Sequence, residues 1–175
     1  FLLPKFDGSS PINMVQIGVF EGQDLVWSLQ NIAKHPQSVV IAIDPWGPTT
    51  KIDAAEMERV HQRALHNLSP WNSRVVVHRA MSQDILTRSY LFQGEAGIYD
   101  LCIIDGDHNA PAVYEDITNC YRICKAGGWL MLDDVENKIA KQNHVKQGLA
   151  QWLADNPGKI KQVWKHRFCE CFEKL

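Results

Sequence analysis

The sequence predicts a doubly wound α/β fold with a mainly parallel seven-stranded sheet and a C-terminal antiparallel hairpin. Three observations predict it. Short apolar runs recur five times along the chain, helical patterns lie between them, and residues 159–175 alternate in the way that two paired strands do. Strands buried on both faces are apolar throughout, and their alternation with helices is typical of a parallel sheet covered on both sides.

The five apolar runs are the predicted parallel strands, because each is short and rich in Val, Ile and Leu. They cover residues 13–19, 38–44, 74–79, 99–105 and 129–134. The closing run "KIKQVWKHRFCECFEKL" mixes basic and apolar residues. This mixture predicts a half-exposed hairpin at one edge of the sheet rather than a groove for phosphate groups.

Helices are predicted between the strands, because apolar residues there recur three and four positions apart. The stripes, in chain order, are Leu25, Leu29, Ile32 and Ala33; Met57, Val60, Ala64 and Leu65; Val113, Ile117, Cys120, Tyr121 and Cys124; and Val145, Leu149, Trp152 and Leu153. A short helix from about Gln83 follows the third strand. Gly127 with Gly128, and Pro157 with Gly158, are expected to end the last two helices.

Length and composition predict one domain, residues 1–175, with a single sizeable core. A net charge of −2 and the absence of a basic stripe argue against a nucleic-acid partner. No apolar run is long enough to cross a membrane, so no membrane partner is expected. The five cysteines lack the paired C-x-x-C spacing of a zinc site, which favours buried thiols in a reducing, cytoplasmic environment.

Ligands of such sheets bind beyond the carboxyl ends of the strands, where the strand order reverses. The first strand ends in "QIGVFEGQD", where Gly18 and Gly22 can let the backbone approach a ligand closely. The second strand ends at Asp44, whose carboxylate can accept hydrogen bonds from both hydroxyls of a ribose. Turn glycines and an Asp-Pro turn are the alternatives. Together the two features favour a nucleoside-containing ligand, with a G-x-x-x-G spacing that differs from the G-x-G-x-x-G of nicotinamide sites.

The sequence resembles the class I S-adenosylmethionine-dependent methyltransferases from about Met14 to Leu153. "QIGVFEG" is similar to their first motif, "AIDPW" to the ribose-binding end of their second strand, and "MSQDIL" to an adenine-contacting segment. "YDLCIIDGDHNAPAVYEDITNCYRICKAGGWLMLDDV" resembles a small O-methyltransferase family within that Rossmann-like fold. The resemblance implies S-adenosylmethionine as the cofactor, bound by Gly18, Gly22, Asp44, Trp46, Met81, Ser82, Gln83 and Asp105. Gln16 departs from the pattern, since many members carry an acidic residue there.

A metal site is implied by the same resemblance. Metal-dependent methyltransferases of the catechol type take one ligand from the end of the fourth strand and two from the end of the fifth, which here are Asp105, Asp133 and Asp134. Three carboxylates at neighbouring strand ends repel one another unless a cation is present, and oxygen ligands favour a hard ion such as Mg²⁺. Helix capping or a turn is the alternative for Asp133 and Asp134, and turn chemistry is preferred for Asp107.

His108 is the predicted catalytic base. It lies three residues after Asp105, the offset at which relatives of the catechol type carry a catalytic Lys and sugar-modifying relatives carry a His. An imidazole can accept a proton near neutral pH without special tuning. A side chain that faces solvent or touches adenine is the alternative.

The predicted function is metal-dependent O-methylation of a small-molecule hydroxyl by S-adenosylmethionine. Two alternatives stay open: a non-catalytic module that binds S-adenosylmethionine, and a nicotinamide-dependent dehydrogenase, against which the glycine spacing argues. The acceptor itself cannot be identified from the sequence. A lid over it would come from residues 47–55, from residues 136–143, from sequence outside residues 1–175, or from another subunit of a homo-oligomer.

Overall fold

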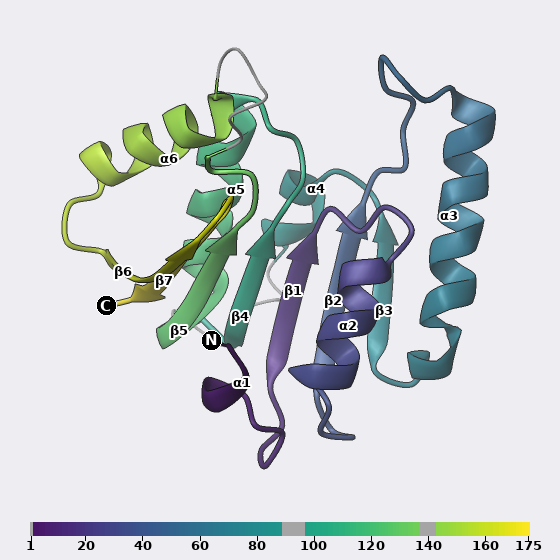
Figure 1. Ribbon diagram of the computed structural model, residues 1–175, viewed down its shortest axis with the longest axis horizontal. Coiled ribbons are helices and arrows are strands. Elements are labelled where there is room, and N and C mark those ends of the chain that lie inside the picture. Colours follow the sequence, from purple (N-terminus) through teal and green to yellow (C-terminus); the bar gives the residue numbers. More distant parts are fainter. Residues whose placement is uncertain (1, 89–96, 137–142) are drawn as a thin grey trace.

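A twisted seven-stranded sheet with helices on both faces forms the frame of the molecule (Figure 1). The computed structural model describes residues 2–88, 97–136 and 143–175. The strands are β1 (Asn13–Ile17), β2 (Val39–Asp44), β3 (Val75–Arg79), β4 (Tyr99–Ile104), β5 (Cys124–Leu132), β6 (Ile160–His166) and β7 (Cys169–Lys174).

The strand order is β3-β2-β1-β4-β5-β7-β6. The first five strands pair in parallel, and β7 pairs antiparallel with both β5 and β6. Ile17 at the end of β1 lies opposite Ile43 of β2 and Ile104 of β4, so three strands end level at one edge. The order reverses at β1, which puts the expected ligand crevice at that edge. The predicted doubly wound fold with its closing hairpin is confirmed.

The helices divide between the two faces of the sheet. They are α1 (Leu2–Lys5), α2 (Gln23–Asn31), α3 (Ala54–Leu68), the 3₁₀ turn η1 (Ser69–Trp71), α4 (Ser82–Leu86), α5 (Ala110–Ile123) and α6 (His144–Asp155). Apolar residues of α2 and α3 pack on one face, and those of α4, α5 and α6 pack on the other. No helix in the described part of the chain is long and apolar enough to span a membrane.

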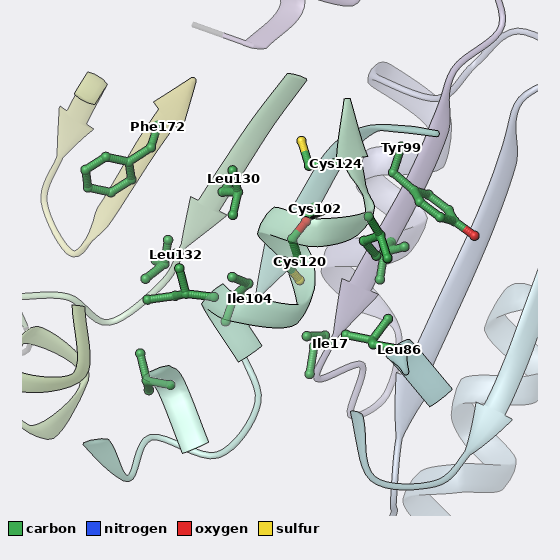
Figure 2. Close-up of a cluster of buried hydrophobic side chains, with 14 of the residues drawn as sticks. Ile17, Leu86, Tyr99, Cys102, Ile104, Cys120, Cys124, Leu130, Leu132 and Phe172 are labelled. Atoms are coloured by element: carbon green, nitrogen blue, oxygen red, sulfur yellow. Dashed lines mark hydrogen bonds between the residues drawn. The ribbon is translucent and has the colours of Figure 1, made fainter. Parts of the chain in front are cut away.

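The core is therefore two apolar layers separated by the sheet. Figure 2 shows part of the layer on the α5 side, where Cys102, Ile104 and Leu132 of the central strands lie near Cys120. All five cysteines are free, and Cys169 alone among them is not fully buried. Their role as small core residues agrees with the sequence analysis.

β5 begins earlier than the sequence predicts. Cys124 pairs with Tyr99, and a register shift follows before Leu101 pairs with Trp129. Gly127, with φ of +70°, lies inside this irregular stretch, where a left-handed residue is accommodated without steric cost. The glycine pair thus belongs to a bulged strand, and α5 already ends at Ile123.

Candidate functional site

A cavity of about 980 Å³ opens at the carboxyl ends of the central strands. Its volume lies at the upper end of the range for small-molecule sites. Four strand-to-helix segments supply its walls, and they bring together most of the residues predicted from the sequence: Gly18, Asp44, Met81, Ser82, Gln83, Asp105 and His108.

The loop after β1 is shaped by close backbone contact. Gly18 has φ of +80°, and a Cβ atom there would lie 1.8 Å from the carbonyl oxygen of Asp105. Only glycine permits that approach. Gly22 also has a positive φ and precedes α2, but it does not line the cavity. The neighbouring side chains of Phe20 and Glu21 line it instead.

Asp44 holds this loop from the end of β2. One carboxylate oxygen accepts the backbone N–H groups of Val19 and Phe20, each at 2.9 Å, and the other accepts the N–H of Trp46 at 2.7 Å. Each oxygen of an ionised carboxylate has two lone pairs, so capacity remains for a ligand hydroxyl. Asp44 therefore orders the loop, and its carboxylate also faces the cavity.

Trp46 lies outside the cavity lining. The sequence analysis placed it among the cofactor contacts, but its side chain is only 2% exposed and does not line the cavity. Its backbone has φ of +42°, its indole N–H donates to the carbonyl of Phe20 at 2.8 Å, and its ring packs on His61. Trp46 supports the loop from within the core.

Gln16 carries an unsatisfied polar atom at the cavity wall. The residue is 2% exposed, and its amide nitrogen donates to the carbonyl of Gly18 at 3.0 Å. Its side-chain oxygen has no hydrogen-bond partner among the described residues. Buried acceptors are rarely left unpaired, so this oxygen favours a ligand donor at that point of the cavity.

Asp116 of α5 is a cavity residue that the sequence analysis missed. It is 3% exposed, and the Ser82 hydroxyl donates a hydrogen bond to its carboxyl group. Burial raises the pKa of Asp116 to about 6, against the opposing effect of the Ser82 hydrogen bond. The available signal was its position three residues after Val113 and one before Ile117, on the apolar stripe of the helix.

His108, which also lines the cavity, lies between two carboxylates. Its Nε2 atom is 3.3 Å from Asp105 Oδ1, and its Nδ1 atom is 3.5 Å from Asp134 Oδ2. The hydrogen bond with Asp105 raises the pKa of His108, although burial opposes the shift. Burial in turn raises the pKa of Asp105, and the negative charges of Asp133 and Asp134 add to this shift. The site holds concentrated negative charge around one imidazole.

The three predicted metal ligands, Asp105, Asp133 and Asp134, follow β4 and β5, and each contacts another side chain in this structure. Within the described ranges, no group of three or more His, Cys, Asp or Glu side chains is arranged to hold a metal ion. Asp133 accepts a hydrogen bond from the Cys169 thiol at 2.7 Å, and His108 lies between Asp105 and Asp134. Their donor chemistry suits a hard cation. The metal site stays a prediction.

The cavity wall is strongly acidic. Its carboxylates are Glu21, Asp24, Asp44, Asp105, Asp107, Glu115 and Asp116. None of the described residues that line it is Lys or Arg. Such a wall attracts cationic ligands and disfavours anionic ones.

One of the two predicted lid segments borders the cavity. Gly47, Pro48 and Thr49, from the loop after β2, form part of its wall. The other segment, residues 136–143, lies mostly outside the described residues, since residues 137–142 are not described.

A family model described as "Methyltransferase domain" matches residues 15–135 of the chain. The match runs from β1 to just beyond β5, and so includes every wall of the cavity. A search of curated protein sequences finds no match.

Solved structures with the same fold include several O-methyltransferases. NovP has a TM-score of 0.69 at 13% identity, with 99% of this chain and 75% of that chain covered. The Bacillus cereus O-methyltransferase in complex with S-adenosylhomocysteine has a TM-score of 0.63 at 19% identity, covering 93% and 74%. TomG from Streptomyces achromogenes, in complex with S-adenosylmethionine, has a TM-score of 0.64 at 16% identity, covering 93% and 73%.

Proposed function

The chain belongs to the methyltransferase-domain family, and on that basis we propose that it transfers the methyl group of S-adenosylmethionine to an oxygen atom of a small molecule. The observation that carries the proposal is the single cavity that joins the loop after β1, Asp44, Ser82 and His108. The family match decides against the nicotinamide-dependent alternative. The bound S-adenosylhomocysteine and S-adenosylmethionine of the Bacillus cereus enzyme and TomG support the choice of cofactor.

The residues present fit the cofactor at three points. The Asp44 carboxylate would accept hydrogen bonds from the ribose hydroxyls. The unpaired oxygen of Gln16 would accept one from the α-ammonium group of the methionyl part. Met81, Ser82 and Gln83 would surround the base. The acidic wall would also favour the positive sulfonium.

The same acidity bears on the acceptor. A phosphorylated or polyanionic acceptor would meet carboxylates with no Lys or Arg among the described lining residues. The proposed methyl acceptor is therefore neutral or cationic, and it is not a nucleic acid.

His108 would remove the acceptor proton. The acceptor oxygen would attack the methyl carbon as its O–H proton passes to the imidazole; the C–O bond forms, the S–C bond breaks, and sulfur keeps the electron pair. Alignment of the two reactants supplies much of the acceleration of such a step. Asp105, Asp133 and Asp134 would hold a divalent cation such as Mg²⁺, which when bound would favour the ionised hydroxyl.

The proposal also covers domain organisation, location in the cell and oligomeric state. A single domain over residues 1–175 is part of the proposal, and one sheet whose strands run from Asn13 to Lys174 supports it. A cytoplasmic location suits five free thiols. A homo-oligomer would supply further cover for the acceptor.

The test begins with calorimetric titration of S-adenosylmethionine and S-adenosylhomocysteine into the protein. Micromolar binding is expected, and the formation of S-adenosylhomocysteine is then followed with neutral, amine-bearing and phosphorylated hydroxyl compounds. Turnover with the first two groups supports the proposal. Cofactor binding without turnover on any acceptor would favour the non-catalytic module, and failure to bind either nucleoside would refute cofactor use.

A further inference from the structure

Asp116 is a buried carboxyl group in the cavity that the proposed reaction does not use. One oxygen accepts the hydrogen bond from Ser82, and the other makes no hydrogen bond among the described residues. This second oxygen lies over the loop after β4, because a Cβ atom built on Gly106 would be 3.4 Å from it. Asp116 is a buried residue that lines the cavity, and an ionised carboxylate oxygen without a partner can accept a hydrogen bond from a ligand donor there.

The position of Asp116 indicates which part of the cofactor it meets. β3 pairs with β2, and Asp44 lies opposite Arg79, so the segment that begins α4 is adjacent to the ribose position. A base attached to that ribose would extend toward Met81 and Ser82. Pro111 and Ala112 of α5 line the same part of the cavity. Asp116 is one helical turn after Ala112, on the same side of α5. It therefore places a polar group next to the apolar residues Met81, Pro111 and Ala112.

We propose that Asp116, braced by Ser82, accepts a hydrogen bond from the exocyclic amino group of adenine and thereby selects a 6-amino purine over a 6-oxo purine. This inference rests on the proposed function. The adenine amino group is a donor, and the carboxylate is an acceptor. The oxygen at the same position of hypoxanthine would face the carboxylate as a second acceptor and leave both unpaired. Sites built to pair with one polar group reject its counterpart strongly.

The test compares S-adenosylhomocysteine with S-inosylhomocysteine by calorimetry at pH 8, where the Asp116 carboxyl is ionised. The unmodified protein is expected to bind S-adenosylhomocysteine at least tenfold more tightly than S-inosylhomocysteine. Asp116→Asn keeps an oxygen for Ser82 and gains an amide N–H that can donate to the 6-oxo group. The preference should therefore shrink by at least about tenfold, mostly through tighter binding of the inosine compound.

Asp84→Asn is the matched control, because Asp84 is an exposed carboxylate of α4 outside the cavity wall. Its preference should equal that of the unmodified protein. Equal weakening of both ligands by Asp116→Asn would assign Asp116 a purely structural role and overturn the inference. If the variant does not fold, the test rests on the unmodified protein. A preference for S-adenosylhomocysteine over S-inosylhomocysteine of less than threefold overturns the inference. Failure to bind either compound would instead contradict the proposed function.

Discussion

Replacing Asp116 with Asn should stabilise the fold above pH 7. The pKa of this buried carboxyl is raised from 3.8 to about 6, so the folded state holds a proton that the unfolded chain has released. For an acid shifted in this direction, the favourable contribution is complete below pH 3.8 and is lost as pH rises through 6. The ionised carboxylate then remains buried at a cost.

The size of that cost follows from the shift. A difference of about two units corresponds to about 3 kcal/mol at pH 7.5, and integration over the two titrations leaves about 1 kcal/mol at pH 4.5. Asn has the shape of the protonated acid, carries no charge and still accepts the bond from Ser82. The advantage of Asp116→Asn should therefore be about 2 kcal/mol larger at pH 7.5 than at pH 4.5.

Urea unfolding of the unliganded protein, followed by circular dichroism at the two pH values, measures this difference. The exposed Asp84→Asn serves as the control and should change stability by less than about 0.5 kcal/mol at either pH. A variant that is less stable than the unmodified protein at pH 7.5, or an advantage that does not change with pH, would refute the reasoning from burial.

Three further predictions concern the cofactor, the metal and the base. Asp44→Ala should weaken S-adenosylmethionine binding at least tenfold in calorimetry, because it would remove the proposed bonds to the ribose as well as the bonds to three backbone N–H groups, each worth roughly 1.5–3 kcal/mol. An unchanged Kd in a folded variant would contradict this prediction. EDTA should abolish turnover and Mg²⁺ restore it if Asp105, Asp133 and Asp134 hold a cation, whereas full activity in metal-checked buffer would end that proposal. His108→Ala should lower kcat by about 10²–10⁴. It should also remove the rise of kcat with pH that is expected above 6.5 in the unmodified protein, where Asp105 raises the pKa of the imidazole. Unchanged turnover and an unchanged pH profile would show that His108 does not act as the base.

The architecture could be predicted from the sequence because its first five strands are short apolar runs and its helices have an apolar stripe on one side. Apolar runs of this kind indicate burial on both faces, and their alternation with helices favours a parallel sheet. The pattern was less informative near Cys124, where apolar spacing continues from α5 into a bulged strand. A period of three to four and a period of two cannot be separated over so few residues.

At two of the predicted site residues the structure shows a local role that depends on residue type, and their contacts to a ligand stay predictions. Gly18 is required by a close backbone approach, and Asp44 by three N–H groups that converge on it. Trp46 and Asp116 could not be placed in this way, because the direction of a side chain after a turn, or on a half-buried helix, depends on tertiary packing. A polar residue on the apolar stripe of α5 was the one available clue.

The last strand in the chain, β7, lies between β5 and β6 (Figure 1). During translation, β6 therefore leaves the ribosome before the strand with which it pairs. Until β7 follows, the half-buried Val163 and Trp164 of the nascent β6 have no sheet to cover them and are open to chaperones. At about 5–20 residues per second, the ribosome itself sets how long this exposure lasts, so slow codons within residues 160–174 should increase chaperone occupancy and aggregation without any change in the folded protein.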